Sequence, residues 1–230
     1  MPDHPPPHPR PVRSFVLRTG RMTAGQRRAL AEHWPDFGID LEAGRMDAAQ
    51  IFGRRRPLVL EIGFGMGDSL LDMCRAEPDK DFIGVEVHPP GVGHLLARAA
   101  AAGIDNLRIY RADAQDVLRD CIADGAIARV QIYFPDPWPK KKHHKRRLLQ
   151  PDFVAHLAQK VCADGLLHLA TDWQNYAEQM RIVLEAAAGW VNIAGPGCYA
   201  EPPAWRPPTK FERRGRGLGH GVWELLYRKI

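Results

Sequence analysis

The stretch from Leu58 to Leu70 constrains the fold of this chain more than any other part of the sequence. It reads Leu-Val-Leu-Glu-Ile-Gly-Phe-Gly-Met-Gly-Asp-Ser-Leu, a short apolar run that ends in an acid and continues into alternating glycines. The apolar run predicts a strand buried on both faces, and the glycines allow a sharp turn without Cβ clashes. Asp68 and Ser69 offer oxygens to cap a following apolar helix. The pattern predicts the first strand, turn and helix of a parallel α/β sheet.

The glycine spacing indicates which class of ligand such a turn would bind. A dinucleotide fingerprint requires Gly-x-Gly-x-x-Gly, but the sixth position counted from Gly63 is Asp68. The sequence resembles instead the Glu-x-Gly-x-Gly-x-Gly motif of S-adenosylmethionine-dependent methyltransferases, beginning at Glu61. A carboxylate there can accept a hydrogen bond from the cationic amino group of S-adenosylmethionine, whereas it would repel a pyrophosphate. A simple strand-to-helix turn is the alternative reading of these glycines.

Two further acids follow predicted strands. The segment 81–87 predicts a second buried strand, and its Glu86 falls where an acid binds ribose hydroxyls in βαβ nucleotide sites. The segment 107–111 predicts a third strand, which places Asp113 to accept a hydrogen bond from an adenine amino group. A surface carboxylate is the alternative for either acid alone. Acids at three strand ends favour a cofactor site.

A rigid, strongly charged loop follows the fourth predicted strand, 128–134. Its first part, Pro135-Asp136-Pro137-Trp138-Pro139, contains three prolines, which exclude a helix or a continuing strand and place Asp136 at the carboxyl edge of the sheet. Its second part, 140–147, contains six Lys or Arg and two His, more positive charge than a solvated face normally concentrates. The loop predicts a ligand site beside a phosphate-binding strip.

The rest of the chain supplies the outer elements of the sheet. We expect a helix from Pro151 that Asp164-Gly165 ends, a strand at 166–170, a helix at 173–187, and strands at 190–193 and 222–228. Thr171 and Asp172 either cap the helix at 173–187 or contact substrate. The long Pro- and Gly-rich loop before the last strand predicts a functional segment around 209–214.

Length and charge suggest one domain and a polyanionic partner. The 230 residues predict a single domain over 23–230, with a helix starting at Thr23, preceded by a basic, Pro- and His-rich tail, 1–22, that we expect to be disordered. The net charge of +5 is concentrated in short segments, which favours nucleic acid. The arginine-rich segment 12–28 is either an arm that orders on RNA or a basic linker.

Composition also indicates what the chain lacks. No apolar run approaches the length that spans a bilayer, and the N-terminus has no apolar signal segment, so we expect a cytoplasmic protein without a membrane partner. The four cysteines have no zinc-like spacing, so we expect no metal. A monomer and a homodimer both remain open.

With these stretches in view, the sequence resembles the bacterial tRNA (guanine-N7)-methyltransferase family from Arg13 to Arg228. Five motifs carry the resemblance, in the family's order: Glu61-Ile-Gly-Phe-Gly-Met-Gly, Gly84-Val-Glu-Val-His, Phe134-Pro-Asp-Pro-Trp-Pro-Lys, Ala170-Thr-Asp-Trp and Thr209-Lys-Phe-Glu-Arg-Arg. One departure is Lys142, where arginine is common in the family, so a bidentate fork is lost. The resemblance implies a class I, Rossmann-like fold with a mostly parallel seven-stranded sheet, helices on both faces and an antiparallel last strand.

The resemblance also implies residue roles. Asp136 is the implied active-site residue. The implied cofactor-binding residues are Glu61, Gly63, Gly65, Glu86, Asp113 and Asp136. The implied substrate-binding residues are Lys140, Asp172, Thr209, Lys210, Phe211 and Glu212. The implied RNA contacts are Lys142, His143, His144, Lys145, Arg146 and Arg147.

The implied reaction is methyl transfer from S-adenosylmethionine to N7 of guanine in tRNA, at position 46 of the variable loop. A small-molecule methyltransferase is one alternative, but it would have no use for the cations beside Asp136. A non-catalytic RNA-binding protein on a methyltransferase scaffold is another, and a nicotinamide enzyme is a third. The glycines and presumed cofactor acids favour the catalytic reading.

Overall fold

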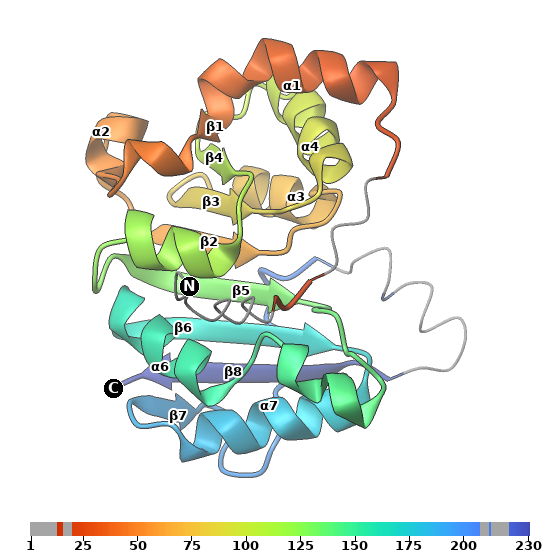
Figure 1. Cartoon of the computed structure of the whole chain (residues 1–230). Helices are drawn as coiled ribbons and strands as arrows, with labels where there is room; N and C mark the ends of the chain where they lie inside the picture. Colours follow the sequence, from red (N-terminus) through yellow and green to blue (C-terminus); the bar gives the residue numbers. More distant parts are fainter. Residues whose placement is uncertain (1–12, 16–19, 208–211, 213–220) are drawn as a thin grey trace, which may run out of the picture.

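The computed structural model describes residues 13–15, 20–207, 212 and 221–230, which form one mixed sheet with helices on both faces (Figure 1). The described strands are β1 (Gly38–Ile39), β2 (Leu58–Ile62), β3 (Asp81–Val85), β4 (Leu107–Tyr110), β5 (Ile127–Tyr133), β6 (Val161–Thr171), β7 (Trp190–Asn192) and β8 (Trp223–Lys229). The described helices are α1 (Ala24–Phe37), α2 (Ala48–Phe52), α3 (Asp68–Ala76), α4 (Pro89–Ala101), α5 (Ala114–Asp116), α6 (Pro151–Lys160) and α7 (Gln174–Ala186), with shorter helical turns η1 (Leu41–Ala43), η2 (Val117–Cys121) and η3 (Lys141–Arg146).

The strand order is β1-β4-β3-β2-β5-β6-β8-β7. Strands β1 to β6 pair in parallel, and β8 runs antiparallel to both β6 and β7. The predicted fold class is therefore confirmed. The predicted number of strands, seven, was wrong for the described residues, because the two-residue β1 adds an edge strand beside β4. Two residues are too few to show an alternating pattern in the sequence. The order reverses between β2 and β5, which opens a crevice at their carboxyl ends.

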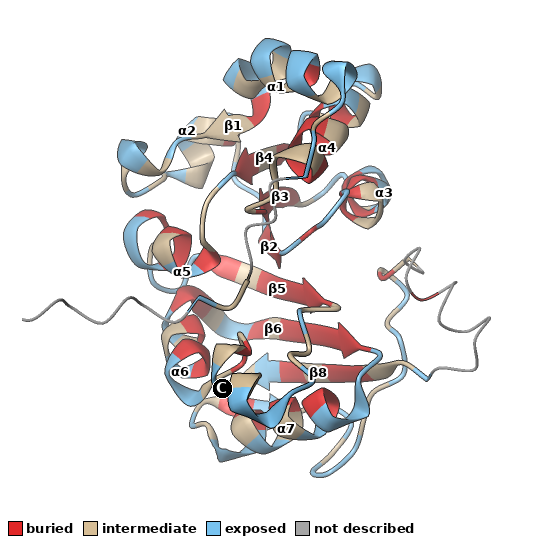
Figure 2. Cartoon of the chain, turned by 45° about the vertical axis from the view of Figure 1, so that its right-hand side comes forward, coloured by how far each residue is buried: buried red, intermediate tan, exposed pale blue. Residues whose placement is uncertain are grey.

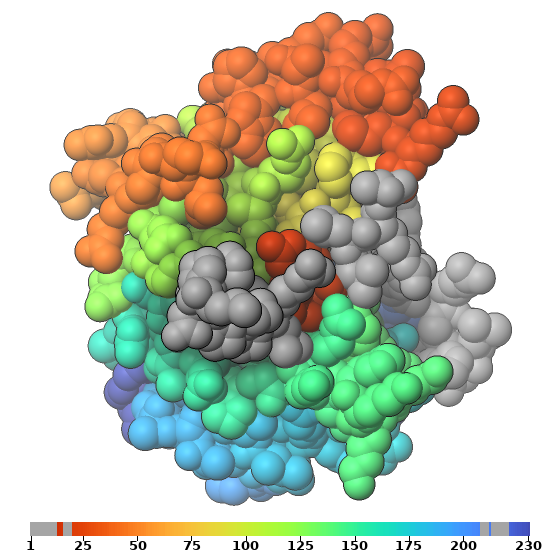
Figure 3. Space-filling model, viewed as in Figure 1, coloured from red at the N-terminus to blue at the C-terminus, as the bar shows by residue number. Residues whose placement is uncertain are grey.

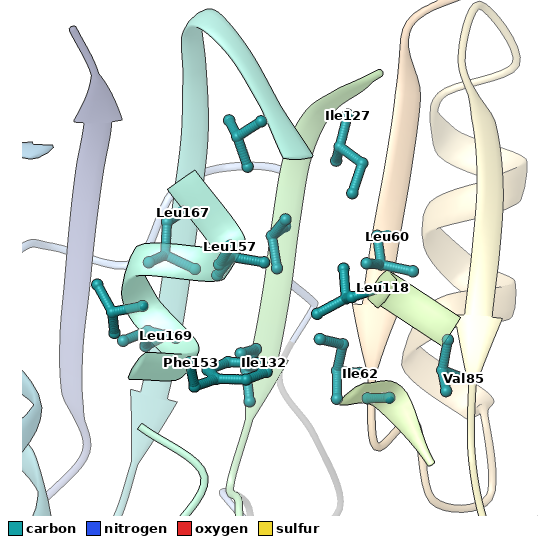
Figure 4. Packing of buried hydrophobic residues seen from close by; sticks show 14 of the residues in the cluster. Leu60, Ile62, Val85, Leu118, Ile127, Ile132, Phe153, Leu157, Leu167 and Leu169 are labelled. Carbon is teal, nitrogen blue, oxygen red and sulfur yellow. The ribbon is translucent and has the colours of Figure 1, made fainter. Parts of the chain in front are cut away.

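One face of the sheet is lined by apolar side chains, and we call it the apolar face. Its residues come from alternate positions of β2, β3, β5, β6 and β8: Leu58, Leu60, Ile62, Ile83, Val85, Val130, Ile132, Leu167, Leu169, Leu225 and Tyr227. Leu118 of η2 and Phe153 and Leu157 of α6 pack against them (Figure 4). Figure 2 shows the buried strands between helices whose outer surfaces are exposed.

The opposite face has two different halves. Over β2, β3 and β4, apolar side chains pack against α1, α3 and α4. Over β5, β6 and β8, the face carries buried polar side chains, which we call the polar layer: Arg129, Gln131, Tyr133, His168 and Glu224. Trp205 covers part of this layer, with its ring centroid 6.0 Å from that of His168 and 4.9 Å from the Arg129 guanidinium.

The start of α1 follows the sequence prediction. Thr23 caps the helix and accepts a hydrogen bond from the backbone N–H of Gln26, whose side chain accepts one from the Thr23 N–H. This reciprocal pair satisfies two N–H groups that a helix start leaves free.

Two predicted helix boundaries were wrong. Gly67, with φ of 76°, is the N-cap of α3, and Asp68 instead accepts a hydrogen bond from Arg98 of α4. Helix α6 ends at Lys160, and β6 begins at Val161, which pairs with Ile127 before the register shifts. The apolar Val161 continues the helical pattern in the sequence, so only its pairing with β5 shows that the strand has begun.

Candidate active site

The glycine turn after β2 presents its backbone to the crevice. Gly63 has φ of 76° and donates its N–H to the Val85 carbonyl at 2.8 Å, and Gly65 has φ of 60°. A Cβ at either glycine would meet no atom within 4 Å, so the space in front of the turn is open. The backbone can therefore approach a ligand closely.

Glu86 joins this turn to the loop after β3. Its Oε2 accepts the Gly65 N–H at 2.8 Å, and its Oε1 accepts the N–H groups of Val87 and His88 at 2.7 and 3.0 Å. Three backbone donors hold the carboxylate in one orientation at the crevice.

Glu61 is buried in β2 and is 2% exposed. Burial raises its pKa to about 8, against a smaller opposing effect from Arg129. Its Oε2 has no hydrogen-bond partner among the residues that the structure describes. A buried carboxyl oxygen without a donor fits a cationic amino group, whose positive charge would favour the ionised form of Glu61.

One cavity joins the ends of four parallel strands. It is lined by Gly63, Glu86, Asp113 and Asp136, together with Ser14 and Phe15 from the N-terminal segment. Asp113 also caps α5 by accepting the Gln115 N–H at 3.0 Å, and burial raises its pKa. Figure 3 shows residues 13–15, in dark red, in the middle of this face of the molecule. Glu61 lies outside the cavity lining.

The proline loop, which we define as Pro135–Pro139, carries Asp136 at the rim of this cavity. It is flanked by Phe134 with φ of 51° and contains Trp138 with φ of 45°, a conformation that is costly for aromatic residues and is often found at functional sites. The Trp138 Nε1–H donates to the Ser14 carbonyl at 3.0 Å. The loop and the N-terminal segment therefore hold one wall of the cavity together.

The basic segment, Lys140–Arg147, follows at once and folds as η3. Lys140, Lys141, Lys142 and Lys145 are exposed, and His143, His144 and Arg146 are half-buried. The Arg146 guanidinium lies 4.2 Å from the Trp138 ring centroid. The exposed cations therefore begin four residues after Asp136, and one arginine of the segment packs on the proline loop.

Comparisons with known proteins agree with this arrangement. Residues 55–225 match the model of a family described as a putative methyltransferase. The chain is 59% identical to a tRNA (guanine-N(7)-)-methyltransferase of Alcanivorax borkumensis, over 96% of this chain and 92% of the relative. It is 58% identical to the protein of the same name from Saccharophagus degradans, over 94% of each. The chain belongs to the tRNA (guanine-N(7)-)-methyltransferase family.

A solved structure shows the same fold at low sequence similarity. A mutant of the 16S rRNA (adenine(1408)-N(1))-methyltransferase from Catenulisporales acidiphilia, with its cosubstrate SAM, matches with a TM-score of 0.56 and 16% identity. The match covers 79% of this chain and 89% of that one. The sheet of this methyltransferase is therefore of the class I type.

The structure separates the residues predicted to bind substrate. Lys140 is exposed, and Asp172 is exposed at the end of β6, beside a groove lined by Trp173 and Trp223. The Trp173 N–H donates to Thr171 Oγ1 at 3.2 Å, while Trp173 itself is the N-cap of α7, so Asp172 does not cap this helix. Thr209, Lys210 and Phe211 lie outside the described residues.

Glu212 is buried. Its Oε2 accepts a hydrogen bond from Arg206 Nη1 at 2.6 Å, and Arg206 also pairs with Glu224. His168 bridges Tyr133 Oη at 2.9 Å and Glu224 Oε2 at 2.7 Å, and burial lowers the His168 pKa. Glu212 is thereby connected to the polar layer.

Sequence reasoning missed Arg206 and the polar layer. One signal was available in β5, where Arg129, Gln131 and Tyr133 alternate with apolar residues in a strand that the parallel sheet requires to be central. Such alternation predicts a face with polar contacts.

Arg147 has a different environment from the rest of the basic segment. It is buried, and its Nε donates to the carbonyl of Pro137 at 2.8 Å. The structure therefore places this predicted RNA contact beneath the proline loop.

No helix in the described part of the chain is long and apolar enough to cross a membrane. Within the described ranges, no group of three or more His, Cys, Asp or Glu side chains could hold a metal ion.

Proposed function

We propose that this chain transfers the methyl group of S-adenosylmethionine to N7 of a guanine in tRNA. The observation that carries the proposal is a cavity that gathers Gly63, Glu86, Asp113 and Asp136, the last of which is followed four residues later by exposed cations. The cavity suits a nucleoside cofactor, and the cations suit the phosphates of a nucleic acid. The names of the relatives support the same reaction.

The residues around the cavity fit this cofactor. The unpartnered Glu61 Oε2 would accept from its amino group, Glu86 would face the ribose hydroxyls, and Asp113 the adenine amino group. Bound S-adenosylmethionine supplies a methyl group on a positively charged sulfur. The open space in front of Gly63 and Gly65 lets the backbone lie against it.

The guanine N7 already carries a lone pair, so the chain needs no general base before transfer. Its main task is orientation, which can remove on the order of 7 to 11 kcal/mol of barrier. Positive charge that appears on the purine makes its N1 and amino protons more acidic. We assign Asp136 to accept from these protons, because that hydrogen bond would strengthen in the transition state.

The decisive experiment compares Asp136→Asn with the parent on an unmodified tRNA transcript. We expect kcat to fall about 10² to 10³-fold, the effect of losing one charge-stabilising hydrogen bond, while the Kd for tRNA stays nearly constant. The product is measured as 7-methylguanosine by nucleoside mass spectrometry. Asp36→Asn, an exposed acid on α1, is the matched control. Equal kcat values in Asp136→Asn and the parent would contradict the assignment.

The same assay tests the class of protein. A non-catalytic RNA-binding protein would show no S-adenosylmethionine affinity by calorimetry and no product. A different methylated nucleoside would retain the fold and cofactor but exclude guanine N7.

We place the target guanine at position 46 of the variable loop. The exposed basic segment can contact phosphates on either side of a base held against Asp136. A transcript with adenine at position 46 should give no 7-methylguanosine, and undiminished product would move the target elsewhere.

A further inference from the structure

Arg147 differs from the other cations of the basic segment in its burial. It is 2% exposed, whereas its neighbour Lys145 is exposed to solvent. Arg147 lines a surface groove with His144 and Lys145, but its three guanidinium nitrogens donate to acceptors within the protein.

The guanidinium of Arg147 connects the proline loop to α7. Its Nε donates to the Pro137 carbonyl at 2.8 Å, its Nη1 to Gln179 Oε1 at 2.6 Å and its Nη2 to Asn175 Oδ1 at 2.9 Å. The guanidinium also lies 4.7 Å from the Tyr176 ring centroid. All three donor atoms therefore point toward fixed neighbours.

All three acceptors are uncharged amide oxygens. Burial lowers the pKa of Arg147, which means that its charge is poorly solvated at this position. A buried cation without a carboxylate partner costs free energy. We therefore expect Arg147 to orient the groups that it binds and not to stabilise the fold.

The geometry concerns Asp136. Pro137 directly follows this acid, and Trp138, the next residue, has φ of 45°. Strained backbone persists only where its surroundings hold it in place. The hydrogen bond from Arg147 Nε to the Pro137 carbonyl holds the peptide that joins Pro137, the residue after the acid, to the strained Trp138.

The residues of α7 that contact Arg147 are also held in place by hydrogen bonds. Gln179 donates to the Leu149 carbonyl at 3.1 Å, and the Tyr176 hydroxyl accepts the Leu149 N–H at 3.2 Å. Helix α7 begins just after the exposed Asp172. Arg147 therefore links the proline loop, which carries the exposed Asp136, to the helix that follows Asp172.

We propose that Arg147 is a positioning residue that sets the orientation of Asp136 through the proline loop and does not bind RNA. This inference rests on the role of Asp136 under the proposed function.

The test separates positioning from RNA contact by two readouts on the full chain. We expect Arg147→Met to lower kcat about 10²-fold, the effect of a small misplacement of a reacting group, and to leave the salt dependence of tRNA binding unchanged. Lys145→Ala should instead flatten the log-log salt slope by about 0.7 to 0.9, the effect of one lost phosphate contact. Arg181→Met, which removes a partly exposed arginine of α7, is the matched control for both readouts.

A conservative variant sharpens the result. Arg147→Lys keeps the charge but loses the planar fork, so one ammonium group cannot reach acceptors on both the loop and α7. We expect its kcat to fall about tenfold or more with an unchanged salt slope. A phosphate contact would be rescued by lysine, so parental kcat in this variant would overturn the proposal, as would a flattened slope in Arg147→Met.

If circular dichroism shows that Arg147→Met does not fold, a second variant tests the same contacts without a substitution at the buried Arg147. The double variant Asn175→Ala with Gln179→Ala removes two acceptors from α7 and should lower kcat with an unchanged slope; unchanged kcat overturns the proposal. Asp136→Asn is assayed in parallel. If it is inactive while the Arg147 variants are fully active, only the positioning role fails, and if it is fully active, the assignment of Asp136 fails.

Discussion

The apolar face and the polar layer belong to the same sheet but are built on different physical terms. The apolar face buries aliphatic side chains under η2, α6 and α7, and it needs no specific partner for any of them. The polar layer buries charged and polar side chains, and each requires a partner, such as Glu77 for Arg129 or Glu224 for His168. The apolar face therefore stabilises the sheet, whereas the polar layer also orients functional segments.

Two residues predicted to belong to the site, Glu61 and Glu212, interact with the polar layer. Glu61 of β2 lies on the same side of the sheet as Arg129, which is its largest charged influence. At the other end, Arg206 joins Glu224 to Glu212. Hydrogen bonds and ion pairs therefore connect β5 to Glu212, a described residue of the segment predicted to bind substrate, whereas Glu61 interacts with this layer through the charge of Arg129.

The largest effect should come from breaking the charge balance of this network. Arg206→Met removes the buried cation that pairs with both Glu212 and Glu224, and we expect a loss of about 3 to 5 kcal/mol in the free energy of unfolding. Urea denaturation measures it. Arg181→Met, which breaks a partly exposed pair with Glu185, should cost less than about 1 kcal/mol. Equal losses in the two variants would remove the distinction between the polar layer and the surface.

A somewhat smaller effect is expected from the apolar face. Leu167→Ala removes a fully buried side chain and should cost about 3 kcal/mol through lost burial and the cavity left behind. Ile182→Ala, at an exposed position of α7, should change stability by less than about 0.5 kcal/mol. The Leu167→Ala loss should be the same at each pH, and a loss that varied with pH would contradict a purely apolar origin.

The smallest effect, counted per pH unit, distinguishes the two faces by their response to pH. The folded-state pKa of Glu61, about 8, is raised, so between about pH 5 and 8 the folded chain holds a proton that the unfolded chain has released. Stability should therefore fall as pH rises through this window, by about 1 kcal/mol per pH unit from this group. Glu61→Gln should remove that decline, as measured by urea denaturation at several pH values. Leu167→Ala should keep the parental slope, and an identical slope in Glu61→Gln would show that Glu61 is ionised in the folded chain.

Much of the central sheet was predictable because its information is local. Strands β2 to β5 are short apolar runs that end in glycine, proline or an acid, and parallel strands place their carboxyl ends at one edge. That rule alone predicted that Glu86, Asp113 and Asp136 would meet, and all three line one cavity. Local pattern failed where competing partners decide the outcome, as for Asp68, which pairs with Arg98 instead of capping α3.

The sequence by itself determined the fold class, the glycine turn and the family, because these depend on contiguous motifs and on the order of strands. The tertiary structure alone decided which cations face solvent and which are buried. Arg146 and Arg147 are adjacent in the chain, yet one lies over the Trp138 ring and the other lies beneath the proline loop. Burial depends on contacts such as those with Asn175 and Gln179, which are distant in sequence, and no local pattern records them.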